Sequence, residues 1–342
     1  MSRKDKVQMA ETVVKSAKKN LTDPSESLVP PFRVEPYYSP RPWGTRDLQP
    51  WADSSNLSEN IGELWLTGDE SKIGTGKFTG QTLATAITRK AEAILGHHHL
   101  GSKEFPLLVK MLFPKEKLSV QVHPDDALAQ RLGNSRGKTE CWYVLDAEPG
   151  AAVALGFRER RTVSEIDAAI KAGTLEALLN WVPVTPGDMI FVDAGTVHAI
   201  GPGSVLLEVQ QQSDLTYRLY DYGRPRELHL RLGFEAMRLE TAAGKVTPKQ
   251  VGSHMQLIST NYFQVDQLDV AAGERSGENF QKPGIAQAIF IANGKGMIDA
   301  RGCEAVTLRQ GQLAVIPATS PDWRLQSHAP MRAIIASAPV PK

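Results

Sequence analysis

The sequence predicts a mainly β protein with two strand-rich halves and a few short helices. Apolar and polar residues alternate in short runs along most of the chain, which is the period of a strand with two different faces. Glycine and proline separate these runs, as expected of turns. A spacing pattern that begins at Gly187 occurs again at Gly311, once in each half. We therefore expect two β domains with a boundary near residue 250.

Composition excludes several classes of protein. The chain has 342 residues, enough for one large domain or two ordinary ones. Its 39 basic and 38 acidic side chains create no overall field that would favour nucleic acid or an anionic membrane. No apolar run approaches the roughly 18 residues of a membrane-spanning helix. The two cysteines, Cys141 and Cys303, lie far apart and suggest neither a disulfide framework nor a thiolate zinc site.

The N-terminal residues 1–29 are polar and predict a disordered tail or a frayed helix. They lack the apolar segment and cleavage site of a secretory signal. Asp5 and Glu11 argue against a mitochondrial presequence. We therefore expect a cytoplasmic protein.

Residues 30–50 are crowded with proline and aromatic side chains, which favours extended chain and turns over helix. The next segment, 61–68, alternates like a strand and places Glu63 and Trp65 on one face. A carboxylate beside an indole suits contact with a sugar. The pattern alone fits an edge strand with a solvated glutamate equally well.

Residues 81–96 predict a short amphipathic helix, and the three histidines 97–99 after it predict an exposed loop. The nearly continuous apolar run 105–113 fits a strand buried on both faces. Lys110 interrupts this run. Because an unpaired buried ammonium is costly, Lys110 must reach an anion, a ligand or solvent, so it is a candidate for substrate or phosphate contact.

The stretch 117–145 contains most of the candidate metal-binding residues. It predicts two strands joined by a polar loop, with Gln121 and His123 on one face about 7 Å apart. Glu140 immediately precedes the second strand, and His198 follows a glycine turn downstream. An amide oxygen, imidazoles and a carboxylate converging from adjacent strands can form a divalent-metal site. Taken alone, His123 could equally be a strand histidine satisfied by a neighbour.

The remaining segments predict packing elements and one more candidate contact. Residues 164–182 predict a pair of helices, capped at Ser164 and broken at Gly173, and residues 228–240 another helix. Further strands are expected at 151–157, 188–192, 205–211, 215–222 and from about 255 to the end.

Arg218 lies in the predicted strand 215–222 and is a candidate for contact with an anion or an oxyanion. Its guanidinium offers donors in a fixed planar fork. The alternative is a structural ion pair with Asp214, Asp221 or Glu208.

The repeated pattern resembles a known motif. Gly187 is followed at a fixed spacing by the turn 193–195 and His198, and Gly311 is followed at the same spacing by a turn and Asp322. Both copies resemble the second conserved motif of the cupin β-barrels, Gly-x5-Pro-x-Gly-x2-His. The resemblance implies two cupin-type jelly-roll β-barrels.

This resemblance also implies that the two barrels differ in function. Residues 30–250 would form the metal-binding, catalytic barrel, with a helical insertion near 164–182. Residues 251–342 would form a C-terminal barrel without metal, because Asp322 stands where the cupin motif has its histidine.

Several segments together resemble the short bacterial form of the type I mannose-6-phosphate isomerases, from about Pro40 to the end. The resemblance is densest in PWGTRDL, IGELWLTG, FPLLVKML, LSVQVHPDDALA, GKTECWYVLDAEPGA, DAGTVHAI and QQSDLTYRLYDYGR. It implies one Zn²⁺ per chain, replaceable by Mn²⁺ or Co²⁺, on Gln121, His123, Glu140 and His198. It implies catalytic roles for Lys138 and Arg218, and substrate contacts at Trp43, Glu63, Lys110 and Ser119.

The activity implied is interconversion of mannose 6-phosphate and fructose 6-phosphate through an enediolate. Lys138, a carboxylate and a metal-bound water remain open as the proton-transferring base. Alternatives are a cupin dioxygenase or epimerase that uses the same ligands, or a non-catalytic sugar-phosphate-binding cupin. The expected partner is a small sugar phosphate, without nucleic acid or membrane, in a monomer or a dimer.

Overall fold

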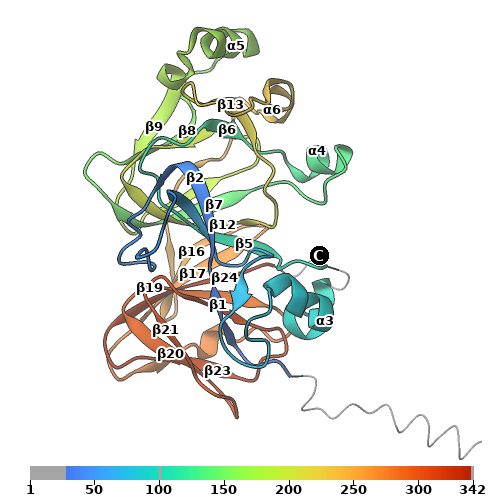
Figure 1. The fold of residues 1–342 in the computed structure, drawn as a ribbon, viewed down its shortest axis with the longest axis vertical. Coiled ribbons are helices and arrows are strands. Elements are labelled where there is room, and N and C mark those ends of the chain that lie inside the picture. Colours follow the sequence, from blue (N-terminus) through green and yellow to red (C-terminus); the bar gives the residue numbers. More distant parts are fainter. Residues whose placement is uncertain (1–27, 100–101, 340–342) are drawn as a thin grey trace, which may run out of the picture.

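The alternating segments form antiparallel β-sheets in the computed structural model, which describes residues 28–99 and 102–339. The expected tail 1–29 lies almost wholly outside the described residues. Four sheets are stacked along the long axis of the described chain (Figure 1). The prediction of a mainly β protein is confirmed. None of the described helices is long and apolar enough to cross a membrane.

The two sheets of the first barrel are the upper ones in Figure 1. The five-stranded sheet has the order β13 (Tyr217–Tyr220), β6 (Val120–Val122), β11 (His198–Ile200), β8 (Ala152–Phe157) and β9 (Leu179–Pro183). The seven-stranded sheet has the order β14 (Gly244–Val246), β10 (Met189–Val192), β7 (Glu140–Ala147), β12 (Ser204–Gln211), β5 (Leu107–Leu112), β3 (Ile61–Trp65) and β2 (Tyr37–Thr45).

The two sheets of the second barrel lie below them. The eight-stranded sheet has the order β15 (Lys249–Val251), β16 (His254–Ser259), β17 (Gln264–Val270), β24 (Met331–Ser337), β19 (Gln287–Asn293), β22 (Leu313–Ile316), β1 (Phe32–Glu35) and β4 (Lys72–Ile73). The four-stranded sheet has the order β18 (Arg275–Ser276), β23 (Trp323–Gln326), β20 (Lys295–Ala300) and β21 (Val306–Arg309).

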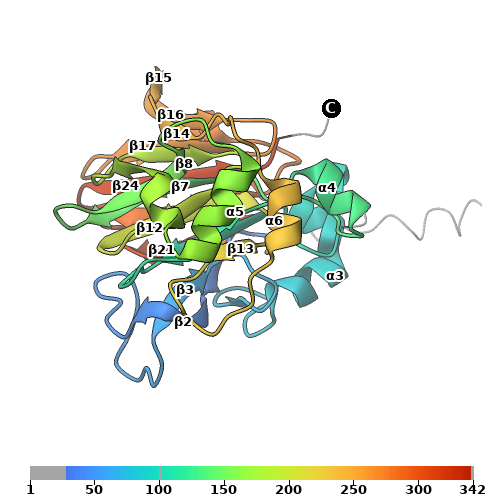
Figure 2. The ribbon, with the colours of Figure 1, turned by 90° about the horizontal axis from the view of Figure 1, so that it is seen from above.

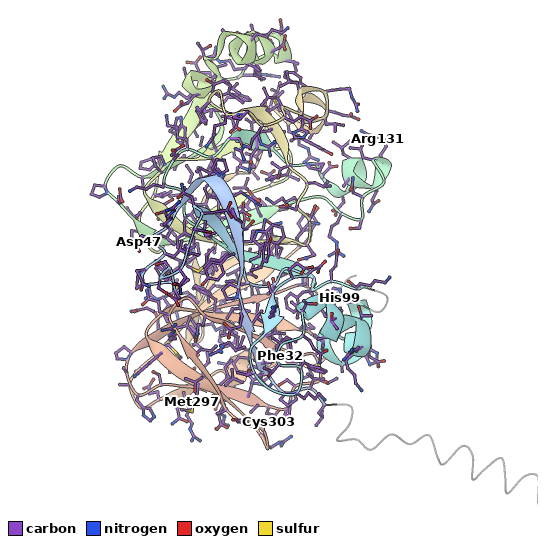
Figure 3. The ribbon with its side chains drawn as sticks, in the orientation of Figure 1. Phe32, Asp47, His99, Arg131, Met297 and Cys303 are labelled. Carbon is purple, nitrogen blue, oxygen red and sulfur yellow. The ribbon has the colours of Figure 1, made fainter. Side chains whose placement is uncertain are left out.

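Each pair of sheets encloses an apolar core, and the two barrels share a third. Trp142 and Ile190 lie in the core of the first barrel, and Ile289 and Leu325 lie in that of the second. The seven- and eight-stranded sheets bury a further cluster between them, which contains Phe32 (labelled in Figure 3). Because side chains alternate between the faces of a strand, one face of the seven-stranded sheet serves this shared core and leaves the other for the interior of the first barrel.

The strands that carry Gln121 and Glu140 were expected to be adjacent, and this expectation is wrong. β6 pairs with β11 and β13, whereas β7 pairs with β10 and β12 in the other sheet. Helix α4 (Asp126–Arg131), capped by Asp125, lies in the segment expected to be a polar loop. The chain therefore crosses from one sheet to the other, so the candidate ligands face each other across the barrel interior.

The helices agree with the expectations in place but differ in extent. α3 (Leu83–Leu95) forms as expected, and the histidines after it form a short 3₁₀ turn, η1 (His97–His99). α6 (Leu230–Ala236) is shorter than the predicted helix 228–240. Another 3₁₀ turn, η3 (Glu278–Phe280), lies in the second barrel.

The predicted helical pair is only partly correct. α5 (Val163–Ala172) is capped by Thr162 rather than Ser164, because Thr162 and Glu165 satisfy each other's backbone N–H groups in a capping box. Gly173 ends α5 as predicted. The second helix is only the 3₁₀ turn η2 (Leu175–Leu178), after which β9 begins. Viewed from above, α5 and α6 lie over the outer face of the five-stranded sheet (Figure 2).

The boundary near residue 250 stays a prediction, but segments from the N-terminal part of the chain contribute to the lower sheet. Phe32 in β1 pairs with Val315 in β22, and β4 pairs with β1. These strands cover an edge that would otherwise expose unpaired backbone groups. The two cysteines are both free: Cys141 is buried in β7, and Cys303 lies at the far end of the second barrel (Figure 3).

Replacement by alanine is expected to reduce stability to different extents at the two glycines of the repeated motif. Both have positive φ, +93° at Gly187 and +82° at Gly311. A Cβ at Gly187 would meet no atom within 4 Å, whereas a Cβ at Gly311 would lie 1.9 Å from the Trp51 carbonyl oxygen. We expect Gly187→Ala to cost only the backbone strain, about 1–2 kcal/mol, and Gly311→Ala to cost about 3 kcal/mol or more. Urea unfolding of both variants tests this, and equal losses would contradict it.

Candidate active site

A cavity of about 560 Å³ opens between the two sheets of the first barrel. Its walls combine residues from both sheets with the loop after β13. They include the predicted site residues Trp43, Glu63, Lys110, Ser119, Gln121, Lys138 and Arg218. His123, Glu140 and His198 lie immediately behind this wall, in contact with Lys138 and Gln121.

The predicted metal ligands converge from β6, β7 and β11. The Nε2 atoms of His123 and His198 lie 3.5 and 3.4 Å from the two carboxylate oxygens of Glu140. The amide nitrogen of Gln121 lies 3.2 Å from His198 Nε2, and a half-turn of this amide would present its oxygen to the same point. His123, Glu140 and His198 are each no more than 1% exposed. These three residues could hold a metal ion.

The imidazole rings are oriented for coordination. Nδ1 of His123 lies 2.7 Å from the Leu215 carbonyl oxygen, and Nδ1 of His198 lies 2.9 Å from that of Thr196. A ring that donates from Nδ1 keeps the lone pair of Nε2 for a metal, which is the usual arrangement around protein-bound metals. Burial lowers the pKa of His198 to about 4. Burial, with the nearby Lys138 ammonium, also holds the pKa of His123 well below its usual value. Both rings are therefore neutral at pH 7.

Glu140 supports the same interpretation. Both of its carboxylate oxygens are buried and accept no well-aligned hydrogen bond from the described residues. Its Oε2 lies 2.9 Å from Lys138 Nζ, an ionic contact. A buried carboxylate with free lone pairs, facing two neutral imidazole nitrogens, fits a divalent cation.

Lys138 borders this ligand cluster. Its Nζ lies 3.2 Å from His123 Nε2, and the side chain is buried. Burial alone would lower the pKa of Lys138, but the surrounding carboxylates, with Glu140 the largest contributor, outweigh burial and raise the pKa. Lys138 is therefore an ammonium at neutral pH and a hydrogen-bond donor, which argues against its use as the base.

Lys110 does not reach solvent. Its side chain is 2% exposed, and Nζ lies 3.1 Å from Asp214 and 3.9 Å from both Glu63 and Glu208. The ammonium also lies over the ring of Trp65, 4.3 Å from its centroid. Of the anion, ligand or solvent that Lys110 was expected to reach, the structure shows carboxylate anions and not solvent, and its contact with substrate stays a prediction.

Glu63 is not a solvated residue on an edge strand. β3 pairs with β2 on one side and β5 on the other. Arg41 donates to both carboxylate oxygens of Glu63 over 3.1 and 2.9 Å, and Trp65 Nε1 donates over 2.6 Å. Burial would raise the pKa of Glu63, but Lys110 and Arg41 outweigh burial and lower it.

Arg218 is directed into the cavity by the loop after β13. Its Nη1 donates to the Glu227 carbonyl oxygen over 2.8 Å, and its buried Nε has no hydrogen-bond partner among the described residues. Burial, together with Arg226, lowers its pKa. The carboxylate of Asp221 is paired with Arg224 and Arg226 instead.

Comparison with known proteins decides the family. The family model "Phosphomannose isomerase type I, catalytic domain" matches residues 32–157. A mannose-6-phosphate isomerase of Streptococcus mutans is 33% identical over 296 residues, which cover 82% of this chain and 90% of that protein. The chain belongs to the type I mannose-6-phosphate isomerase family.

Other members agree. A mannose-6-phosphate isomerase of Bacillus subtilis is 33% identical over 318 residues, 87% of this chain and 96% of that protein. The crystal structure of a mannose 6-phosphate isomerase from Bacillus subtilis superposes with a TM-score of 0.79 at 28% identity, and covers 90% of this chain and 99% of that one. This match confirms the expected cupin-type fold.

In this chain, the sequence did not indicate that Glu208 lies at the cavity. Glu208 appeared only as a possible partner of Arg218. Glu208 lines the cavity, is 4% exposed and accepts a hydrogen bond from Trp142 Nε1 over 3.1 Å. Burial raises its pKa to about 7. A usable signal existed, because Glu208 interrupts the apolar run 205–209 just as Lys110 interrupts 105–113. The two residues pair directly across β12 and β5.

Proposed function

We propose that the chain interconverts mannose 6-phosphate and fructose 6-phosphate by proton transfer through an enediolate. Family membership supports this reaction. The observation that carries the proposal is that three metal-type ligands, a protonated lysine and a buried carboxylate of raised pKa meet at one cavity. A dioxygenase would have no use for the cationic residues of this cavity.

Gln121, His123, Glu140 and His198 would hold the metal, and we propose Zn²⁺. Two neutral imidazoles, a carboxylate and an amide oxygen suit zinc, and Mn²⁺ or Co²⁺ could replace it because glutamine is a weak ligand. When bound, the cation supplies positive charge beside the two substrate oxygens on which the enediolate develops negative charge.

Glu208 is our candidate for the base that moves the proton. It would take the proton from C2 of mannose 6-phosphate and return it to C1, both on one face of the enediolate, while a second proton moves from O2 to O1. Its pKa of about 7 lies near the operating pH, where general acid–base catalysis is most efficient. Glu63 and Asp214 are weaker bases, because the lysines and arginines around them outweigh burial and lower their pKa values.

The remaining cavity residues would bind and orient the sugar phosphate. Lys138 would donate hydrogen bonds to the developing oxyanion. Ser119 Oγ lies 3.2 Å from Gln121 Oε1, and after the half-turn that presents the amide oxygen to the metal it would accept a hydrogen bond from the amide nitrogen and so orient the amide. Trp43 forms an apolar wall. Lys110 is neutralised by three carboxylates, so we place it in orienting Glu63 and Glu208 as well as contacting substrate.

Arg218 would contact the substrate phosphate or the enediolate oxygen. Removing such a charged contact should cost about 2–4 kcal/mol in transition-state stabilisation, or roughly 30- to 1000-fold in kcat/KM. A phosphate contact would raise mainly KM, and an enediolate contact would lower mainly kcat. Arg218→Lys should recover little, because a flexible point charge does not replace a planar fork. Steady-state kinetics of Arg218→Ala and Arg218→Lys test this, with thermal melts alongside. An alanine variant with wild-type kcat/KM would remove Arg218 from the site.

The expected partner is the sugar phosphate alone. The cytoplasmic location and the choice between monomer and dimer stay predictions. The proposed reaction is tested by proton NMR of mannose 6-phosphate incubated with the purified chain. We expect fructose 6-phosphate signals to appear until equilibrium. Unchanged mannose 6-phosphate with the zinc-loaded protein would overturn the proposal.

A further inference from the structure

The two barrels have the same strand topology. The upper large sheet contains the order β2-β3-β5-β12-β7-β10, and the lower one contains β15-β16-β17-β24-β19-β22. The smaller sheets correspond as well, with β6-β11-β8-β9 matched by β18-β23-β20-β21. Corresponding strands also follow the same order along the chain. A residue of the second barrel can therefore be matched to the first by register.

Polar residues of the second barrel stand at active-site positions of the first. Glu140 pairs with the fifth residue after Gly187, and Gln287 pairs with the fifth residue after Gly311, so Gln287 occupies the position of Glu140. The strand register can be followed further, from β7 through β12 to β5 in the first barrel and from β19 through β24 to β17 in the second. It places Asp266 at the position of Lys110.

These residues carry unused hydrogen-bonding atoms. Gln287 and Asp266 are each 1% exposed, and neither Gln287 Nε2 nor Asp266 Oδ1 has a hydrogen-bond partner among the described residues. The same is true of Nδ1 of His254, whose Nε2 lies 3.7 Å from Asp266 Oδ1. Leaving such atoms without a hydrogen bond costs about 1–3 kcal/mol each, so a polar molecule is expected to form hydrogen bonds with them.

The unused atoms lie inside the second barrel, at the end that corresponds to the active site. Leu268 follows Asp266 on the same face of β17, and Ile289 follows Gln287 on that of β19, and both belong to the core of this barrel. The ring of Phe280, from the same core, lies 4.5 Å from that of His254.

The rim of the cluster contains half-buried groups through which a ligand could enter. Lys282 donates to Ser337 Oγ over 2.8 Å, and Gln264 donates to Asp266 Oδ2 over 2.7 Å. Lys282 and Gln264 are half-buried, and the His254 side chain is 10% exposed.

The charges of this cluster exclude ions as its ligand. It offers a single carboxylate, that of Asp266, which is under the influence of the Lys282 ammonium, and Gln287 lies two strands away on β19; this arrangement does not suit a metal cation. The carboxylate likewise opposes a phosphate. A hydroxyl group, in contrast, can donate to Asp266 Oδ1 and accept from Gln287 Nε2.

We propose that the C-terminal barrel binds a small neutral polyhydroxylated molecule, a sugar or polyol, at His254, Asp266 and Gln287. This second site is independent of the proposed isomerase reaction, because none of its residues lines the catalytic cavity.

The test is a titration of the intact enzyme with D-mannitol, followed through the histidine ring signals in ¹H–¹⁵N NMR spectra. Mannitol lacks the phosphate that the catalytic cavity would recognise. We expect a saturable shift of the His254 signals, with a Kd of about 1–10 mM for a ligand of this size, and unchanged His123 and His198 signals. Gln287→Leu should weaken binding at least ~10-fold. Gln326→Leu, in the same barrel but outside the cluster, should leave binding unchanged.

Lys282→Met, in the half-buried rim, provides a second variant if Gln287→Leu fails to fold, and it should also weaken binding. The absence of a saturable His254 shift would mean that ordered water alone completes these atoms and would overturn the proposal. An equal shift in both glutamine variants would do the same, because binding would then lie elsewhere.

Discussion

His198→Ala is expected to lose its bound metal and at least about 1000-fold of its isomerase activity, since a catalytic cation contributes several kcal/mol of charge stabilisation. Truncation removes one imidazole ligand and leaves Glu140 facing a buried void. The ring also contacts Trp142 and the Gln121 amide, so the variant should orient its remaining ligands less well. Metal content by elemental analysis and kinetics on mannose 6-phosphate measure the two effects together.

His328→Ala is the matched control for this variant. His328 is exposed in the second barrel, and its replacement should change neither metal content nor rate. Thermal melts separate loss of metal from loss of fold. A folded His198→Ala protein with a full complement of metal and full activity would remove this cluster from the reaction.

Glu208→Gln is expected to lower kcat by about 10²- to 10⁴-fold with little change in KM, the usual loss when a general base is removed. Glutamine keeps the shape of the side chain and can still accept the hydrogen bond of Trp142, so packing should survive. Glu148→Gln, an exposed change in the same barrel, is the matched control and should keep wild-type rates.

The pH dependence of kcat/KM tests independently whether Glu208 acts as the base. A base must be deprotonated, so wild-type kcat/KM should rise with pH through the pKa of Glu208, about 7 from burial. A bound divalent cation would lower this pKa, so the acidic limb of the profile should lie at or below about pH 7. Glu208→Gln should lose that limb. A variant that keeps both the limb and the rate would assign the proton transfer to another group.

Much of the site followed from local patterns. Alternation along 118–123 placed Gln121 and His123 on one face, and the lysine inside an apolar run identified Lys110. Both signals depend only on the period of a strand and on the cost of burying charge. The resemblance to a family added Lys138, which no spacing rule could have joined to the ligands, whereas Arg218 was already a candidate from its place in the strand 215–222.

The features that were missed depend on contacts between distant segments. β6 and β7 lie in different sheets, because the chain crosses the barrel through α4. β1 joins the C-terminal sheet by pairing Phe32 with Val315, far along the chain, and no local pattern encodes such a partner. Glu208 looked like an ordinary charge in a strand until its register against Lys110 and its burial showed its place in the cavity.

The most direct test of the account is turnover of mannose 6-phosphate by one purified sample, measured in a coupled assay before chelation, after chelation and after zinc is returned. We expect activity with about one divalent ion per chain, loss of activity when the ion is removed, and recovery when zinc is added back. Full turnover by the metal-free protein, or no turnover by the zinc-loaded protein, would contradict the account.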